Sequence, residues 1–417
     1  MDYQAHTLSN GIRLISVPSR SNISHACFLI YAGSRDEKPE KSGLAHFIEH
    51  LIFKRTTKRN TNQILNRLEL VGADLNAYTT KEYTCIHASF LNPYLDRTLD
   101  LFEDLIFHSI FPEDEMAKET DIILDEIASY QDQPDEAIND DFEDMLFDGH
   151  PLGKNILGTP ESVGSFKQAD IFDFIKSHYR TDHMVLGVSG NYDHKRLIYK
   201  AEKFFAKAPK SNDTTAHQET NTNPYIPQKR TITKPINQTH GVIGTRSYSV
   251  YSPHKIGLSL LNNLLGGAGM SSRLNLELRE KHGIAYNIES NYTPFSDTGI
   301  FSIYFGTDVE KTEKALYLIH RELKKLRDKP LSHIQLHQAK QKFTGQIALA
   351  EENRLNVLLS MSKSILDYNR VDSLEEIFNQ VYAVTASQLL EIADETFNPS
   401  KLSVLLFKPS EPHSLVL

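Results

Sequence analysis

The sequence predicts an α+β protein made of two similar α/β-sandwich halves, each a mostly antiparallel sheet covered by helices. The chain has 417 residues, which is long for one hydrophobic core and suits two domains. The polar stretch 209–230 has no apolar periodicity and divides the chain almost in half. On both sides of it, strands, an apolar helix, more strands and long helices follow in the same order, which favours an internal duplication. We therefore assign domains 1–210 and 230–417, joined by a linker at 211–229.

Composition and charge argue against several classes of protein. Apolar residues make up 40% of the chain and charged residues 24%, and no apolar run is long enough for a membrane span. The N-terminus has no basic region followed by an apolar stretch, so we expect no signal peptide and a cytoplasmic location. The net charge of −9 argues against a nucleic-acid partner. Cys27 and Cys85 lie in apolar runs and are interpreted as buried side chains rather than a disulfide.

Strands in the first half are predicted from short apolar or alternating runs bounded by turn residues. The turn signal Ser9-Asn10-Gly11 separates two short strands within 4–17. Four further runs have strand character: 25–32, 73–80, 83–90 and 184–190. The mostly apolar run 25–32 is expected to be buried, whereas 83–90 alternates between two faces.

Helices are predicted from apolar periodicity and from end signals. One face of the segment 61–71 is apolar and carries Ile64, Leu65, Leu68 and Val71. The helix at 112–130 begins with Pro112, and the three acidic residues that follow complement the helix dipole. Four other segments are interpreted as helices: 43–53, 94–109, 134–148 and 165–178.

The most informative stretch is the apolar segment 43–53, which contains the pattern H-x-x-E-H. In a helix, His46 and His50 lie one turn apart on the same face, and Glu49 borders that face. Buried polar groups cost free energy unless they are paired or bound to a metal. Two imidazoles and a carboxylate in this order are the inverted form of the zinc-protease helix, with two metal ligands and a general base. Because so short a pattern also arises by chance, the interpretation requires a third ligand.

A catalytic zinc site has three protein ligands and one open position for water. The third ligand should be an acidic or histidine residue of the first half, on an element that packs against 43–53. Glu126 is the best candidate, because it lies on a predicted helix beside Ile123 and Ile127, where a carboxylate is otherwise unfavourable. Glu119 lies two turns earlier on the same face of that helix.

The second half contains a matching apolar helix that lacks the two histidines and the glutamate of the motif. Aligning Gly43 with Gly257 pairs the three motif residues with Leu260, Asn263 and Leu264, none of which is a histidine or an acid. An ancestral duplication in which one copy keeps the metal site explains this pattern.

The combination of a helical H-x-x-E-H with Glu126, some seventy-odd residues later in Ile-Ile-Leu-Asp-Glu-Ile, resembles the pitrilysin family of zinc peptidases. That family includes insulin-degrading enzyme and mitochondrial processing peptidase. The length and the single pair of halves are most similar to its bacterial, processing-peptidase-like branch. The similarity covers nearly the whole chain and includes 9–14, 33–56, 75–79, 158–159 and 273–286. One departure is Phe53-Lys54-Arg55-Thr56, where the family often has Phe-Lys-Gly-Thr.

The resemblance implies one zinc ion per chain, bound by His46, His50 and Glu126. It implies that Glu49 is the general base that takes a proton from water and passes it to the leaving amine. Glu119 is implied as a further catalytic residue that supports the site without binding the metal.

The resemblance also implies residues that hold the substrate. Arg279 and Tyr286 match a substrate-binding pair of the family and would stabilise the oxyanion. Asn76, Ala77 and Tyr78 match the family segment that adds a peptide to a sheet edge by backbone hydrogen bonds. Because these groups lie in both halves of the sequence, the halves are expected to face each other as half of a clamshell.

The function implied by the resemblance is that of a zinc endopeptidase acting on peptides or presequence-like unstructured segments. Family members of this size pair two chains, so we expect a homodimer, or a heterodimer with an inactive homologue. One alternative is a non-catalytic structural or partner subunit, although such subunits usually lose metal-site residues. A second alternative is a metal-dependent hydrolase of non-peptide amides.

Overall fold

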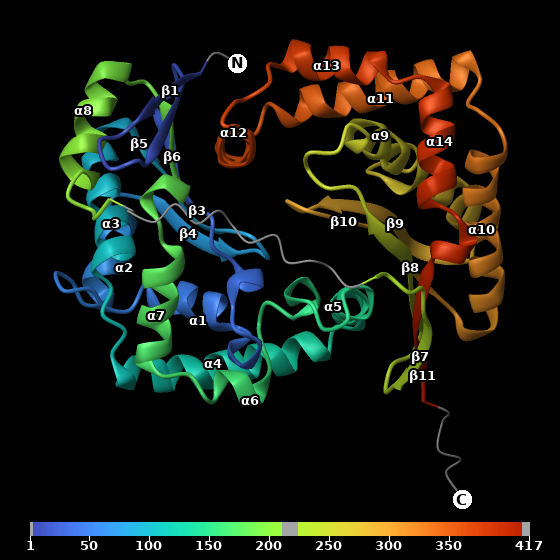
Figure 1. The fold of residues 1–417 in the computed structure, drawn as a ribbon, viewed down its shortest axis with the longest axis horizontal. Coiled ribbons are helices and arrows are strands. Elements are labelled where there is room, and N and C mark those ends of the chain that lie inside the picture. The colour runs from blue at the N-terminus through green and yellow to red at the C-terminus, as the bar shows by residue number, and fades with distance from the viewer. Residues whose placement is uncertain (1–2, 211–223, 411–417) are drawn as a thin grey trace, which may run out of the picture. The chain divides into compact units, whose positions relative to one another are not determined.

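The computed structural model describes residues 3–210 and 224–410, which form two compact units (Figure 1). The first unit takes its residues from Met1–Ala128, Lys154–Gln218 and Leu349–Leu374, and the second from Ser129–Gly153, Glu219–Ala348 and Glu375–Leu417. Each half of the chain therefore supplies one segment to the other unit. Of the predicted linker 211–229, residues 211–223 lie outside the described residues, and 224–228 have no regular structure.

The sheet of the first unit has the strand order β1-β2-β6-β3-β5-β4. Its strands are β1 (Gln4–Thr7), β2 (Arg13–Pro18), β3 (Ile23–Ile30), β4 (Asp74–Thr79), β5 (Thr84–Leu91) and β6 (Met184–Gly190). Only β2 and β6 are parallel, and the other neighbours in this sheet are antiparallel. Each strand predicted in the first half is confirmed. β4 lies at an edge, and among the described strands it pairs with β5 alone.

Helices cover both faces of this sheet because its central strands are apolar on both sides. Phe28 of β3 packs into the larger core, whereas Cys27 and Leu29 face the opposite side. The helices that pack on the first face include α1 (Leu44–Leu51), α2 (Thr61–Glu69), α3 (Leu95–His108), α4 (Glu113–Gln131), α7 (Gln168–His178) and α8 (His194–Phe205). The opposite face is covered by α12 (Arg354–Tyr368), which comes from the second half of the sequence. Cys27 and Cys85 are buried and free, as interpreted.

One predicted helix begins later than expected. The segment 165–178 divides into a loop and α7, which starts at Gln168 and follows the short helix α6 (Pro160–Val163). Lys167 has extended backbone angles, and its N–H donates to Oδ2 of Asp170 over 2.9 Å. This local hydrogen bond competes with helix formation at Lys167 and fixes the start of α7.

The sheet of the second unit has the order β7-β11-β8-β10-β9. Its strands are β7 (Lys229–Lys234), β8 (Thr239–Ser247), β9 (Ala285–Pro294), β10 (Gly299–Thr307) and β11 (Ser403–Pro409). Only β7 and β11 are parallel, so the order and directions repeat those of β2-β6-β3-β5-β4. This repetition confirms the prediction of two similar halves.

The helices of the second unit also cover both faces of its sheet. One face carries α9 (Lys255–Gly266), α10 (Thr312–Asp328), α11 (His333–Ala350) and α14 (Ala386–Thr396). The other face is covered by α5 (Pro134–Leu146), which the first half of the sequence supplies. The helix α13 (Leu374–Ala383) also belongs to this unit, except for its first residue. The two units have thus exchanged one covering helix each, α5 for α12.

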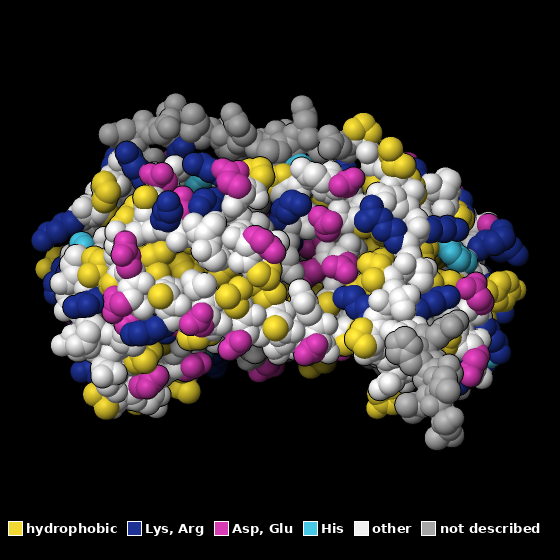
Figure 2. Space-filling model, turned by 90° about the horizontal axis from the view of Figure 1, so that it is seen from below, with side chains coloured by type: hydrophobic (Ala, Val, Ile, Leu, Met, Phe, Trp, Pro, Cys, Tyr) yellow, Lys and Arg dark blue, Asp and Glu magenta, His cyan; other side chains and the backbone are white. Residues whose placement is uncertain are grey.

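The surface carries charges of both signs. Figure 2 shows acidic and basic side chains interspersed over the face that it draws. Within residues 3–210 and 224–410, no helix has both the length and the apolar character needed to cross a bilayer.

Candidate metal centre

The helix α1, which carries His46, Glu49 and His50, is fixed at its N-terminus by two contacts. Gly43 has φ +94°, and a Cβ added there would lie 2.6 Å from the carbonyl oxygen of Leu157, so the position requires glycine. The carboxylate of Glu37 accepts hydrogen bonds from the N–H groups of Gly43 and Ala45, both 2.8 Å long. It thereby satisfies N–H groups that have no partner within the helix.

Sequence reasoning missed Glu37, because this residue lies six positions before Gly43 rather than at the N-cap. The only sequence signal is an acidic residue in the charged loop that precedes the helix. That signal is common to many solvent-exposed loops, so it does not identify a cap.

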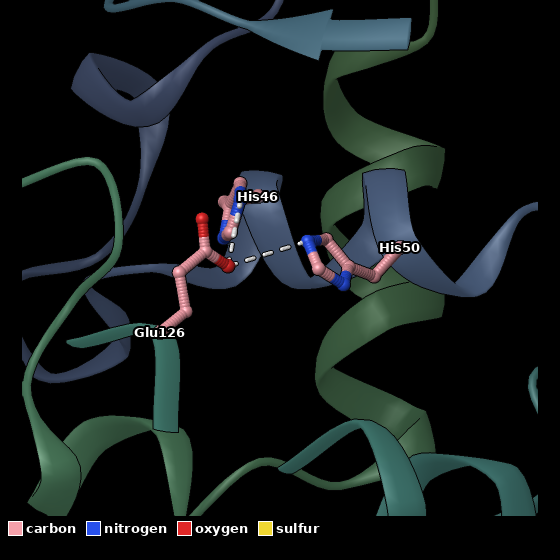
Figure 3. Close-up of side chains that lie close together, drawn as sticks. All are labelled: His46, His50 and Glu126. Atoms are coloured by element: carbon pink, nitrogen blue, oxygen red, sulfur yellow. Dashed lines mark ion pairs between the residues drawn. The ribbon is translucent and has the colours of Figure 1, made fainter. Parts of the chain in front are cut away.

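The structure brings the three predicted ligands together (Figure 3). Nε2 of His46 lies 3.9 Å and Nε2 of His50 lies 3.6 Å from the same carboxylate oxygen of Glu126, which projects from α4. One ligand atom from each residue lies within 4.8 Å of the others. Ligand atoms around a tetrahedral zinc ion, at about 2.0–2.1 Å from it, are roughly 3.3 Å apart. Small side-chain movements therefore suffice, and two nitrogens with one carboxylate oxygen are donors that zinc accepts.

The two imidazoles differ in their surroundings. Burial, with a smaller contribution from the neighbouring His50, lowers the pKa of His46 to about 4, so this ring is neutral near pH 7, as metal binding requires. Nδ1 of His50 lies 3.0 Å from Oε2 of the buried Glu119, and this hydrogen bond is the main reason that the pKa of His50 is raised. A carboxylate only accepts, so Nδ1 of His50 donates to Glu119, and Nε2, which lies 3.6 Å from Oε2 of Glu126, is the ring nitrogen placed to bind a metal.

Glu49 lies next to this cluster and has one oxygen held by the sheet. Oγ1 of Thr79, on the edge strand β4, donates to Oε2 of Glu49 over 2.6 Å. Burial raises the pKa of Glu49, and the hydrogen bond from Thr79 opposes that effect. Leu75 and Ala77 pack into the core on the α1 side, and Thr79 shares their face because strand residues alternate.

Thr79 was not identified from the sequence. A threonine in a strand is unremarkable, because β-branched residues are common there. The useful signal is a hydroxyl on the helix-facing side of an edge strand, and this signal exists only once the packing of β4 against α1 is known.

The residues predicted to bind substrate lie in two places. Asn76, Ala77 and Tyr78 lie on β4, and the side chain of Asn76 accepts a hydrogen bond from the N–H of Ala77 over 2.9 Å. In the second unit, Arg279 lies in a π-helical turn, with its guanidinium 5.2 Å from the ring centre of Tyr286. Tyr286, near the start of β9, is 85% exposed. Such turns are frequent at functional sites, and this one places the pair side by side.

Comparison with known proteins identifies the family. Residues 14–160 match the model described as Insulinase (Peptidase family M16), and residues 165–343 match the model described as Peptidase M16 inactive domain. An uncharacterized zinc protease of Bacillus subtilis is 30% identical over 407 residues, which cover 97% of this chain and 98% of that protein. The chain belongs to peptidase family M16. The predicted resemblance to pitrilysin-type zinc peptidases is therefore confirmed.

Other similar proteins agree with the M16 assignment. An uncharacterized zinc protease of Rickettsia bellii is 30% identical, covering 97% of each chain. A solved protease of Helicobacter pylori superposes with a TM-score of 0.88 at 23% identity, covering 98% of this chain and 100% of that one. A Pseudomonas fluorescens structure described as a peptidase M16 inactive domain gives 0.90 at 20% identity and 99% of each chain. These two solved structures show that the M16 chain described here shares their fold.

Proposed function

We propose that this M16 chain is a zinc-dependent endopeptidase that hydrolyses peptides or presequence-like unstructured segments. The observation that supports this most directly is the convergence of His46, His50 and Glu126, with Glu49 beside them on the same helix. In this proposal the metal ligands and the general base lie in domain 1–210, and 230–417 is a homologous domain without a metal site that contributes Arg279 and Tyr286. Relatives that are similar over nearly their whole length are named zinc proteases, which agrees with this assignment.

Each residue near the centre has a role in this proposal. His46, His50 and Glu126 hold the zinc ion, which supplies a Lewis acid for water and for the scissile carbonyl. Glu49 takes a proton from the attacking water and delivers it to the leaving amine. Thr79 holds one oxygen of Glu49, so the other oxygen is available for this transfer.

The edge strand β4 suits an extended peptide. Its outer backbone groups have no strand partner among the described residues, so a substrate segment adds there through main-chain hydrogen bonds. This mode demands an unfolded segment, because a folded protein does not present a free strand. Arg279 and Tyr286, which lie side by side in the second unit, carry hydrogen-bond donors that suit a peptide substrate.

Metal removal tests the proposal. The purified protein should contain zinc and cleave members of a quenched-fluorescence peptide library, and a chelator such as 1,10-phenanthroline should abolish cleavage, because the metal supplies the Lewis acid. Adding zinc to the stripped protein should restore activity, whereas magnesium, which prefers oxygen ligands, should not. Protein that binds zinc but cleaves no peptide would favour a non-catalytic partner subunit instead.

The active form is proposed to be a homodimer, because one chain carries both the metal motif and the Arg279–Tyr286 pair. Light scattering of the purified protein should then give a mass near twice the 47.4 kDa of one chain. A protein that cleaves peptides and remains at the mass of one chain would contradict the homodimer and leave the peptidase proposal in place.

A further inference from the structure

The loop after α1 carries a lysine that contacts the support of the metal centre. Nζ of Lys54 lies 2.6 Å from Oε1 of Glu119, whose other oxygen is bonded to Nδ1 of His50. We propose that Lys54 is a positioning residue for the metal centre: by fixing the carboxylate of Glu119, it keeps the His50 ring oriented with Nε2 towards Glu126. The inference rests on the proposed metal site and adds a residue to it.

The hydrogen bond to His50 does not by itself fix the orientation of the Glu119 carboxylate. A carboxylate bonded through a single oxygen still rotates and swings about its side-chain torsions, and the imidazole that donates to it moves with it. Lys54 holds the second oxygen, so both ends of the carboxylate are fixed and the His50 ring has one preferred orientation. The positive charge of Lys54 also stabilises the ionised form of Glu119. This carboxylate is only 2% exposed, and a buried carboxylate requires a partner of opposite charge.

Lys54 is itself held in place by the loop that carries it. The N–H of Lys54 donates to the carbonyl of Leu51, and its own carbonyl accepts from Oγ1 of Thr61 over 2.7 Å. Two residues later, Thr56 donates through its hydroxyl to the fully buried carboxylate of Asp104 on α3, over 2.9 Å. The backbone of Lys54 is therefore fixed on both sides.

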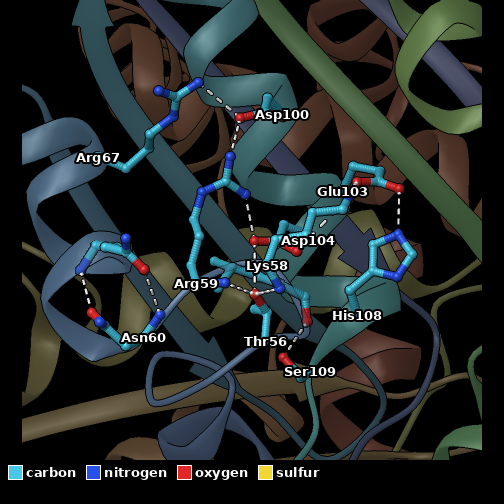
Figure 4. Close-up of polar contacts among 12 residues, drawn as sticks. Thr56, Lys58, Arg59, Asn60, Arg67, Asp100, Glu103, Asp104, His108 and Ser109 are labelled. Atoms are coloured by element: carbon cyan, nitrogen blue, oxygen red, sulfur yellow. Dashed lines mark hydrogen bonds and ion pairs between the residues drawn. The ribbon is translucent and has the colours of Figure 1, made fainter.

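A polar network attaches the rest of this loop to α3 (Figure 4). Arg59 pairs with Asp104 and with Asp100, and Arg67 from α2 also reaches Asp100, over 2.8 Å. Lys58 pairs with Glu103 over 2.8 Å, and the hydroxyl of Thr56 accepts from the N–H of Arg59 over 2.9 Å. These contacts hold the loop independently of Lys54, so replacing Lys54 removes its contact with Glu119 and leaves the loop attached.

The chain offers a matched control. Lys58 lies in the same loop and forms an ion pair of similar length with Glu103 and a longer one, of 3.9 Å, with Asp104. Its side chain is more exposed than that of Lys54, and neither of its partners touches a metal ligand. Exposed ion pairs contribute little free energy. Lys58→Met therefore removes a lysine and its ion pairs from the loop, while Thr56 and Arg59 still attach the loop to Asp104 and the Lys54–Glu119–His50 contacts are kept.

The experiment measures zinc affinity by competition with a chromophoric chelator, after thermal unfolding shows that each variant is folded. Loss of a group that supports a metal ligand typically weakens binding by 10- to 100-fold, and Lys54 lies one contact further out, so Lys54→Met should weaken zinc binding by about tenfold. Lys54→Arg should retain near-normal affinity, because guanidinium also binds a carboxylate, and Lys58→Met should bind as the wild type does. Lys54→Gln replaces Lys54→Met if the latter does not fold.

A second substitution separates positioning from general stabilisation. In a Glu119→Gln background, which itself weakens binding, Lys54→Met should cause no further loss, because the group through which it acts has changed. A tenfold loss that persists in that background, or Lys54→Met binding zinc as tightly as the wild type, overturns the inference and leaves the proposed function intact. A wild-type protein that does not bind zinc overturns the proposed function and the inference together.

Discussion

Replacing Glu49 with glutamine is expected to lower kcat by about 10²- to 10⁴-fold, the usual contribution of a positioned general base. The amide keeps the size of the side chain and still accepts a hydrogen bond from Thr79, but it takes no proton from water. Zinc content should stay unchanged, because Glu49 is not among the three converging ligands. The measurement is steady-state cleavage of a peptide substrate, alongside metal analysis of the same preparation.

The control for Glu49→Gln is Glu69→Gln, which makes the same chemical change at an exposed position at the end of α2. It should leave kcat and zinc content as they are in the wild type. Cleavage by Glu49→Gln at the wild-type rate would remove Glu49 from the mechanism, and a loss of zinc in this variant would assign it to the metal ligands instead.

Replacing Glu126 with glutamine is expected to lower the zinc content as well as the activity, whereas Glu49→Gln keeps its zinc. The activity of Glu126→Gln is lost because the metal is lost. Oε2 of Glu126 is the atom that both Nε2 atoms face, and a neutral amide oxygen is a much weaker zinc ligand than a carboxylate. The bound zinc should fall from about one ion per chain to a small fraction of that value after dialysis. Metal analysis and peptide cleavage should fall together, and excess zinc should restore part of both.

The control for Glu126→Gln is Asp121→Asn, which removes a carboxylate from an exposed position on the same helix. It should bind zinc and cleave peptide normally. Full zinc content in Glu126→Gln would show that another group completes the site, and the third ligand would then have to be sought elsewhere.

Residue spacing within single helices explains which parts of the candidate metal centre could be predicted from the sequence. The spacing of His46, Glu49 and His50 places them on one side of a helix whatever the helix packs against, so the sequence indicates a candidate for two ligands and a base. Glu126 and Glu119 were predicted to share a face for the same reason. That this face meets α1, so that Glu126 reaches both histidines and Glu119 reaches His50, depends on how α4 packs in the first unit.

The contacts that no pattern indicated are those that join α1 or Glu119 to a residue outside the same helix. Thr79 reaches Glu49 from β4, Glu37 caps α1 from the preceding loop, and Lys54 reaches Glu119 from the loop that follows α1. Threonine, glutamate and lysine are all ordinary in such segments. Their roles follow only from distances of less than 3 Å between side chains and backbone groups that folding brings together.

Local signals were enough to predict the α+β class, the repeated order of elements and the candidate metal-ligand pattern of α1, because periodicity and turn signals arise within a few residues of the chain. Which helix covers which sheet became clear only from the packing of the folded chain. An apolar stripe on α5 or α12 requires burial but does not specify a partner, and both sheets present two apolar faces. The exchange of these two helices between the units therefore became visible only when long-range packing was known.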